Sequence, residues 1–81
     1  MVTVRVLGTS RCSDCTRAKD FLSGHGVDFE WIDIDVDATA ASEVEAHNDG
    51  RRVVPTIFFD DGAVLVEPSD QQLADQLGLT T

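Results

Sequence analysis

Basic residues, proline and cysteine are scarce in this sequence, and tyrosine is absent. Six lysines and arginines stand against fifteen aspartates and glutamates, which gives a formal net charge of −9. Nucleic-acid binding depends on basic residues that displace the counterions of phosphate, so we expect no nucleic-acid partner. The sequence also lacks any apolar run approaching the roughly 20 residues of a membrane-spanning helix, so we expect no membrane association.

The first eight residues lack the features of a signal peptide. They alternate apolar and polar side chains, without a basic start followed by an apolar stretch. We therefore expect the chain to work in the cytoplasm. Its 81 residues suit a single domain, 1–81, because single cores typically use about 50 to 200 residues. We expect that domain to be a monomer.

Hydrophobic periodicity and turn residues divide the chain into strands and helices in the order β-α-β-α-β-β-α. The predicted strands are Thr3–Leu7, Val27–Asp35, Pro55–Phe59 and Ala63–Val66, and the predicted helices are Ser13–Ser23, Thr39–Asn48 and a last helix capped by Ser69. The first helix has a predicted buried stripe of Ala18, Phe21 and Leu22. Asp61-Gly62 is a hairpin turn signal. The pattern predicts an α/β protein with a mixed four-stranded sheet flanked by three helices.

The two cysteines, Cys12 and Cys15, are the candidate chemical centre. A disulfide between them would close a very short loop and stabilise little, so a catalytic or metal-binding role is favoured over a structural one. A zinc site needs four ligands, and the remaining candidates, His25 and His47, lie at the ends of different predicted helices. We therefore expect no metal site within one chain. A metal or iron–sulfur cluster shared between two chains remains an alternative.

Cys12 lies where the first strand passes into the first helix. Unpaired backbone N–H groups and the helix dipole favour a thiolate at this position, and Arg11 and Arg17 would add to the effect. Asp14 opposes it, because its carboxylate is a like charge beside the thiolate. Cys15 lies one turn further into the helix and is expected to be more buried. Cys12 is therefore the predicted attacking thiol, and Cys15 the resolving one.

Val54-Pro55-Thr56 opens the third predicted strand. A proline there cannot donate to the sheet and tolerates a cis bond better than other residues do. An ordinary strand-start proline is the alternative. A cis bond would turn the Val54 backbone towards Cys12, where it could pair with a bound peptide or thiol.

These motifs resemble those of the glutaredoxins, and most closely the mycoredoxins of actinobacteria. The resemblance rests on the segments 9–15 and 48–56, on Asp61-Gly62 and on Glu67-Pro68-Ser69. It implies the thioredoxin (glutaredoxin-like) fold and a disulfide oxidoreductase with catalytic Cys12 and Cys15. The candidate substrate- or thiol-binding residues are Thr9, Arg11, Asp14, Val54, Pro55, Thr56, Ser69 and Asp70.

The resemblance also implies the co-substrate. Mycoredoxins reduce mixed disulfides between proteins and mycothiol, so we expect no tightly bound cofactor but mycothiol or another low-molecular-weight thiol. The expected partners are disulfide-containing proteins, with electrons from that thiol or from a flavin disulfide reductase. Alternatives are a redoxin that thioredoxin reductase reduces and that serves a specific protein, a cluster-binding dimer, and a redox-inactive adaptor.

Several positions depart from the glutaredoxin pattern. Ser13-Asp14 replaces the usual Pro-Tyr pair between the cysteines, and Thr9 replaces a lysine that many members place before them. Val66-Glu67-Pro68 replaces the Gly-Gly glutathione signature before the last helix. The aromatic and Arg-Pro motif of redoxins that serve ribonucleotide reductase is also missing.

Overall fold

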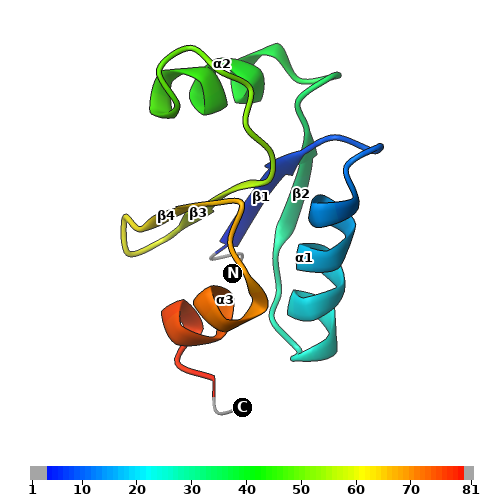
Figure 1. Cartoon of the computed structure of the whole chain (residues 1–81), viewed down its shortest axis with the longest axis vertical. Helices are drawn as coiled ribbons and strands as arrows, with labels where there is room; N and C mark the ends of the chain where they lie inside the picture. Colours follow the sequence, from blue (N-terminus) through cyan, green and yellow to red (C-terminus); the bar gives the residue numbers. More distant parts are fainter. Residues whose placement is uncertain (1–3, 80–81) are drawn as a thin grey trace.

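The computed structural model describes residues 4–79, which form a four-stranded sheet with helices on both faces (Figure 1). The strands are β1 (Val4–Gly8), β2 (Glu30–Asp33), β3 (Thr56–Phe59) and β4 (Val64–Val66), and the helices are α1 (Ser13–Gly24), α2 (Ala38–His47) and α3 (Asp70–Leu77). The strand order is β2-β1-β3-β4, with β1 and β2 parallel and the other pairs antiparallel. The predicted element order and mixed sheet are confirmed. None of the helices in the described residues is long and apolar enough to cross a membrane.

β2 is shorter than the predicted strand Val27–Asp35, which is a correction to its bounds. The Asp33 carboxylate accepts a hydrogen bond from the Asp35 backbone N–H at 2.9 Å, and the Asp33 carbonyl accepts one from Asp37. These bonds form a turn directly after the strand. Asp37 then caps α2 by accepting from the Ala40 N–H at 3.0 Å, so this helix begins at Ala38 rather than Thr39.

The other bounds shift by a residue or two. Pro55 and Ala63 precede β3 and β4 instead of belonging to them, and α1 extends through Gly24. The predicted start of the first strand, Thr3, lies outside the described residues. Phe21, predicted to be buried, is only partly so, and its ring lies 4.4 Å from that of His25 between ring centroids.

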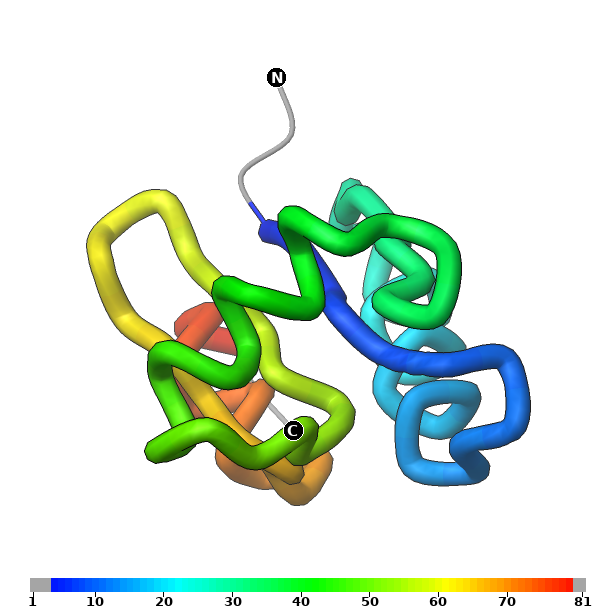
Figure 2. The backbone as a smooth tube through the Cα atoms, turned by 90° about the horizontal axis from the view of Figure 1, so that it is seen from above, coloured from blue at the N-terminus to red at the C-terminus, as the bar shows by residue number. Residues whose placement is uncertain are grey.

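The sheet separates two apolar clusters, because alternate residues of each strand point to opposite faces. α1 and α3 cover one face and α2 covers the other. The first cluster contains Val4, Val6, Ala18, Leu22, Ile57, Phe59 and Leu73. The second contains Leu7, Ile34, Ala40, Ala41 and Val44. Seen from above, the β3–β4 hairpin and α1 lie on opposite sides of β1 (Figure 2).

Three connecting segments meet at one end of the sheet. β1 and β2 are parallel, so the segments that follow them leave from the same end, and β3 runs the opposite way and begins there. The loop after β1, the turn after β2 and the segment leading into β3 therefore converge in the upper part of Figure 1. The cysteine motif and Val54-Pro55 lie on two of these segments.

Gly8, the last residue of β1, lies where Cys15 and Trp31 approach the strand. A Cβ at Gly8 would overlap Cys15 Sγ and would stand 3.0 Å from Cη2 of Trp31. Cys15 is completely buried, so its sulfur has no room to move away. Glycine at position 8 is therefore required by packing.

We expect Gly8→Ala to lower the free energy of unfolding by about 2 kcal/mol, as overpacked core substitutions do. Gly24→Ala is the matched control, because a Cβ there meets nothing within 4 Å. It should leave stability within about 0.5 kcal/mol of wild type or raise it. Urea unfolding of the three proteins measures both effects. Equal stability of Gly8→Ala and Gly24→Ala would contradict the packing argument.

Candidate active site

Cys12 is the N-cap of α1. Its backbone is extended, with φ −93° and ψ 113°, and its Sγ accepts a hydrogen bond from the Cys15 backbone N–H at 3.1 Å. The sulfur therefore lies at the positive end of the helix dipole, with a backbone donor aimed at it. The side chain is partly exposed, so a disulfide could reach it. The structure thus confirms the predicted position of Cys12.

Cys15 has the opposite environment. It is completely buried one turn into α1. Burial and the hydrogen bond with Cys12 raise the pKa of the Cys15 thiol to about 12, although the Thr9 backbone and the Lys19 charge act in the other direction. The two thiols therefore differ in access, and Cys15 remains protonated at neutral pH.

The Val54–Pro55 peptide bond is cis, as the sequence predicted. The Val54 carbonyl oxygen lies 3.9 Å from Cys12 Sγ, within range of a weak hydrogen bond from the thiol. Thr56 is fully buried, and its hydroxyl donates to the Val53 carbonyl at 2.7 Å and accepts from Asn48 Nδ2 at 3.3 Å. These two bonds hold the segment before β3, so the buried Thr56 side chain stabilises the segment that carries the Val54 carbonyl.

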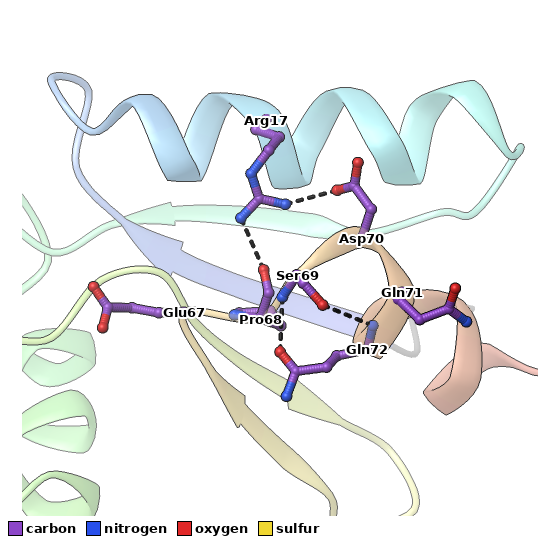
Figure 3. A pocket seen from close by; sticks show the side chains of 7 residues that line it. All are labelled: Arg17, Glu67, Pro68, Ser69, Asp70, Gln71 and Gln72. Carbon is purple, nitrogen blue, oxygen red and sulfur yellow. Dashed lines mark hydrogen bonds and ion pairs between the residues drawn. The ribbon is translucent and has the colours of Figure 1, made fainter.

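Arg17 connects α1 to the start of α3 (Figure 3). Its guanidinium lies 2.6 Å from an Asp70 carboxylate oxygen, and it donates to the Pro68 carbonyl at 2.8 Å. Its Nε is 3.8 Å from Asp14 Oδ1. We expected the Arg17 charge to act on the Cys12 sulfur. The guanidinium is bound instead by Asp70, the Pro68 carbonyl and Asp14.

Arg11 and Thr9 belong to the loop that precedes Cys12. The Arg11 side chain is 88% exposed, and its nearest carboxylate is that of Asp35 at 3.9 Å. The Thr9 carbonyl accepts a hydrogen bond from the Cys12 backbone N–H at 3.4 Å. Thr9 therefore shapes the loop through its backbone, whereas Arg11 extends into solvent.

An open groove of about 540 Å³ lies at the N-terminus of α3. It is lined by Arg17, Glu67, Pro68, Ser69, Asp70, Gln71 and Gln72. Ser69 and Gln72 form a capping box: the Ser69 N–H donates to Gln72 Oε1 at 2.8 Å, and the Gln72 N–H donates to Ser69 Oγ at 3.1 Å. The Glu67 N–H donates to the Pro55 carbonyl at 2.9 Å, which joins the groove to the cis-proline segment.

Within residues 4–79, no three cysteine, histidine or acidic side chains lie close enough together to hold a metal ion. Gly8 and Trp31, which lie close to Cys15, were missed as parts of the site by sequence reasoning. The Lys19 ammonium lies 3.8 Å from the centroid of the Trp31 ring. A glycine at the end of a strand next to a cysteine pair is the signal that could have indicated this close approach.

The raised pKa of Cys15 makes stability depend on pH. A thiol with a higher pKa in the folded chain (about 12) than the ordinary 9.0 contributes fully below about pH 9, and its contribution is lost as the pH rises towards 12. We expect the free energy of unfolding to fall by about 2 kcal/mol between roughly pH 8 and 10.5. Urea unfolding across this range measures it, and the absence of tyrosine leaves few other groups that titrate there.

Cys15→Ala should remove most of this loss of stability at alkaline pH. It should also lower the free energy of unfolding by a constant amount at every pH, because it leaves a small cavity. Cys12→Ser is the control and should keep the loss, because burial of Cys15 is its main cause. An alkaline decline as steep in Cys15→Ala as in wild type would refute the assignment.

Comparison with solved structures supports the fold. A mutant of the thioredoxin-like protein BC3987 superposes with a TM-score of 0.84 at 25% identity, covering 99% of this chain and 100% of that one. The glutaredoxin of Methanosarcina mazei superposes with a TM-score of 0.82 at 26% identity, covering 96% of this chain and 80% of that one. The βαβαββα order and the mixed sheet are those of the thioredoxin-like fold.

Sequence comparison supports the family. The glutaredoxin family model matches residues 2–64. Mycoredoxin 1 of Corynebacterium glutamicum is 35% identical over 69 residues, which cover 84% of this chain and 84% of that protein. The helix-capping cysteine, the buried second cysteine and the cis proline are all within the matched region. The chain therefore belongs to the glutaredoxin family and is a glutaredoxin-like thiol–disulfide oxidoreductase that carries its redox pair as Cys12 and Cys15.

Proposed function

We propose that this chain reduces mixed disulfides between proteins and a low-molecular-weight thiol, with Cys12 as the nucleophile and mycothiol as the thiol. The observation that most directly supports this proposal is the environment of Cys12. Its side chain is partly exposed, and its Sγ accepts a hydrogen bond from the Cys15 N–H at 3.1 Å. The similarity to mycoredoxin 1 supports mycothiol as the thiol. The reaction requires a reducing compartment, and we propose that a monomer performs it in the cytoplasm.

In the first step, the Cys12 thiolate attacks the small-thiol sulfur of the mixed disulfide. A new sulfur–sulfur bond forms at Cys12, the old one breaks, and the protein cysteine leaves as a thiolate that takes a proton from water. The Val54 carbonyl, 3.9 Å from Cys12 Sγ, lies where it would accept a backbone N–H of the bound substrate. Release of Cys12 from the small thiol requires a second thiolate.

Two thiols can supply that second attack. A second small thiol regenerates Cys12 and leaves as a symmetric disulfide, so that the two small thiols together provide two electrons. Alternatively, the Cys15 thiolate attacks Cys12 Sγ, and the small thiol leaves as a thiolate that takes a proton. The Cys12–Cys15 disulfide is then reduced by two electrons, from two small thiols or from a flavin disulfide reductase. Because burial raises the pKa of Cys15 to about 12, little of it is thiolate at neutral pH, which favours attack by the external thiol.

The remaining substrate contacts are proposed from their positions. Ser69 and Asp70 border the groove, Asp14 is exposed in the first turn of α1, and Thr9 and Arg11 flank Cys12 in the chain. Pro55 and Thr56 are buried, so their contribution is to hold the Val54 backbone in place.

We expect Cys12→Ser to lower turnover of a protein–mycothiol mixed disulfide by about a hundredfold or more, because it removes the nucleophile. Cys15→Ser should retain the reaction that uses the external thiol and lose the one that passes through the internal disulfide. An NADPH-coupled assay with mycothiol and its reductase measures both, and parallel assays with glutathione and its reductase and with thioredoxin reductase alone compare the donors.

Equal activity of Cys12→Ser and wild type would refute the assignment of the nucleophile. Faster reduction by thioredoxin reductase alone than by mycothiol would replace the proposed donor. A visible absorbance band on the purified protein would instead indicate a cluster-binding dimer.

A further inference from the structure

The groove at the start of α3 carries more negative than positive charge. Glu67 and Asp70 contribute two carboxylates to its lining, whereas Arg17 is its cation. Both acidic residues are exposed. The charge of the lining therefore disfavours an anion.

The cation of the groove is already bound. The Arg17 guanidinium contacts Asp70 at 2.6 Å, the Pro68 carbonyl at 2.8 Å and Asp14 at 3.8 Å. A ligand carboxylate would therefore compete with Asp70 for this guanidinium. The backbone N–H groups of Ser69 and Gln72 are also occupied, by the capping box. Two of the backbone donors near this helix N-terminus are therefore satisfied internally.

Glu67 is oriented away from this network. Its side chain points away from Arg17 and Asp70 (Figure 3), and no hydrogen bond or ion pair to the Glu67 carboxylate is found among the described residues. Its backbone adopts φ 49°, which is the left-handed region. Its N–H donates to the Pro55 carbonyl at 2.9 Å. Glu67 is thus tied by its backbone to the segment that contacts Cys12.

A short path of contacts links Glu67 to the reacting sulfur. The Val54 carbonyl lies 3.9 Å from Cys12 Sγ, and the next residue, Pro55, accepts the Glu67 N–H. A small thiol joined to Cys12 and lying along Val54 would extend towards the groove and the Glu67 carboxylate. Hydroxyl groups on that thiol could donate to the carboxylate, whereas a carboxylate on it would be repelled.

We propose that Glu67 is a specificity-determining residue that makes the site select uncharged, hydroxyl-bearing thiols over thiols that carry a carboxylate. The proposal rests on the proposed function, because it concerns the small-thiol half of the disulfide that Cys12 attacks. Repulsion between like charges near a protein surface is enough to slow the anionic substrate by about threefold to tenfold.

The test uses two symmetric disulfides of similar size, hydroxyethyl disulfide and dithiodipropionate, which differ in bearing hydroxyl groups or carboxylates. The fully reduced chain is mixed with each one, and its disappearance is followed by mass spectrometry of acid-quenched samples. Each rate constant is divided by that of dithiothreitol with the same disulfide, which removes the intrinsic reactivity. The measured quantity is the ratio of the two normalised rate constants, hydroxyl over carboxylate.

We expect Glu67→Gln to lower this ratio by about threefold to tenfold and Glu67→Lys to lower it further. Glutamine and lysine adopt the left-handed region about as easily as glutamate does, so these variants add no backbone strain. Asp28→Asn is the matched control, because it removes the same charge from an exposed residue beyond the far end of α1 and should leave the ratio unchanged. Added salt should reduce the wild-type ratio.

The outcomes separate the two proposals. An unchanged ratio in Glu67→Gln, or an equal fall in Asp28→Asn, overturns the role of Glu67 and leaves the proposed function standing. A wild-type chain that reacts with neither disulfide faster than dithiothreitol does overturns the proposed function, and the role of Glu67 with it.

Discussion

The hydrogen bond from the Cys15 backbone N–H to Cys12 Sγ is the interaction on which the site depends. It exists only if the chain turns sharply from β1 into α1 at Cys12, so that the sulfur stands at the helix N-terminus. That turn in turn requires α1 to lie against β1 closely enough to bury Cys15. Gly8 permits this approach, because any Cβ there would occupy the space of Cys15 Sγ. One missing side chain in β1 thus allows the two thiols to acquire different chemistry.

The sheet brings the second half of the site to the same place. β3 pairs with β1 in an antiparallel register that sets Leu7 opposite Thr56, so the residues just before β3 meet those just after β1. Thr56 then anchors its own N-terminal neighbours through the hydrogen bonds of its buried hydroxyl. Val54 is positioned by the core of the sheet, even though its carbonyl faces the partly exposed Cys12.

The features that sequence reasoning predicted correctly are those that depend on local chemistry. The cysteine spacing at a strand–helix junction predicted the N-cap position of Cys12, and Ser69 was correctly predicted to cap the last helix. The predicted end of β2 was wrong, because the hydrogen bond that the Asp33 side chain accepts from the Asp35 N–H competes with extension of the strand. The contacts of Arg17 could not be predicted, since Asp70 is 53 residues away in the chain and meets it only through packing of α3. Side-chain pairs between distant elements follow from tertiary structure, which periodicity does not describe.

The distribution of charge near the site matters more than the net charge of −9. The chain extends 34 × 25 × 24 Å, whereas charges in about 0.15 M salt are screened over about 8 Å. The net charge therefore mainly affects how charged molecules approach the protein surface. Acidic residues further than this screening length from a thiol bound to Cys12 hardly act on that thiol. Around that thiol, Arg17 is shared between Asp14 and Asp70, so the two carboxylates largely cancel its field. Glu67 remains as the uncompensated charge on the groove side of the cis-proline segment. For this reason a single carboxylate can set the selectivity for the small thiol in a protein that carries many acidic residues.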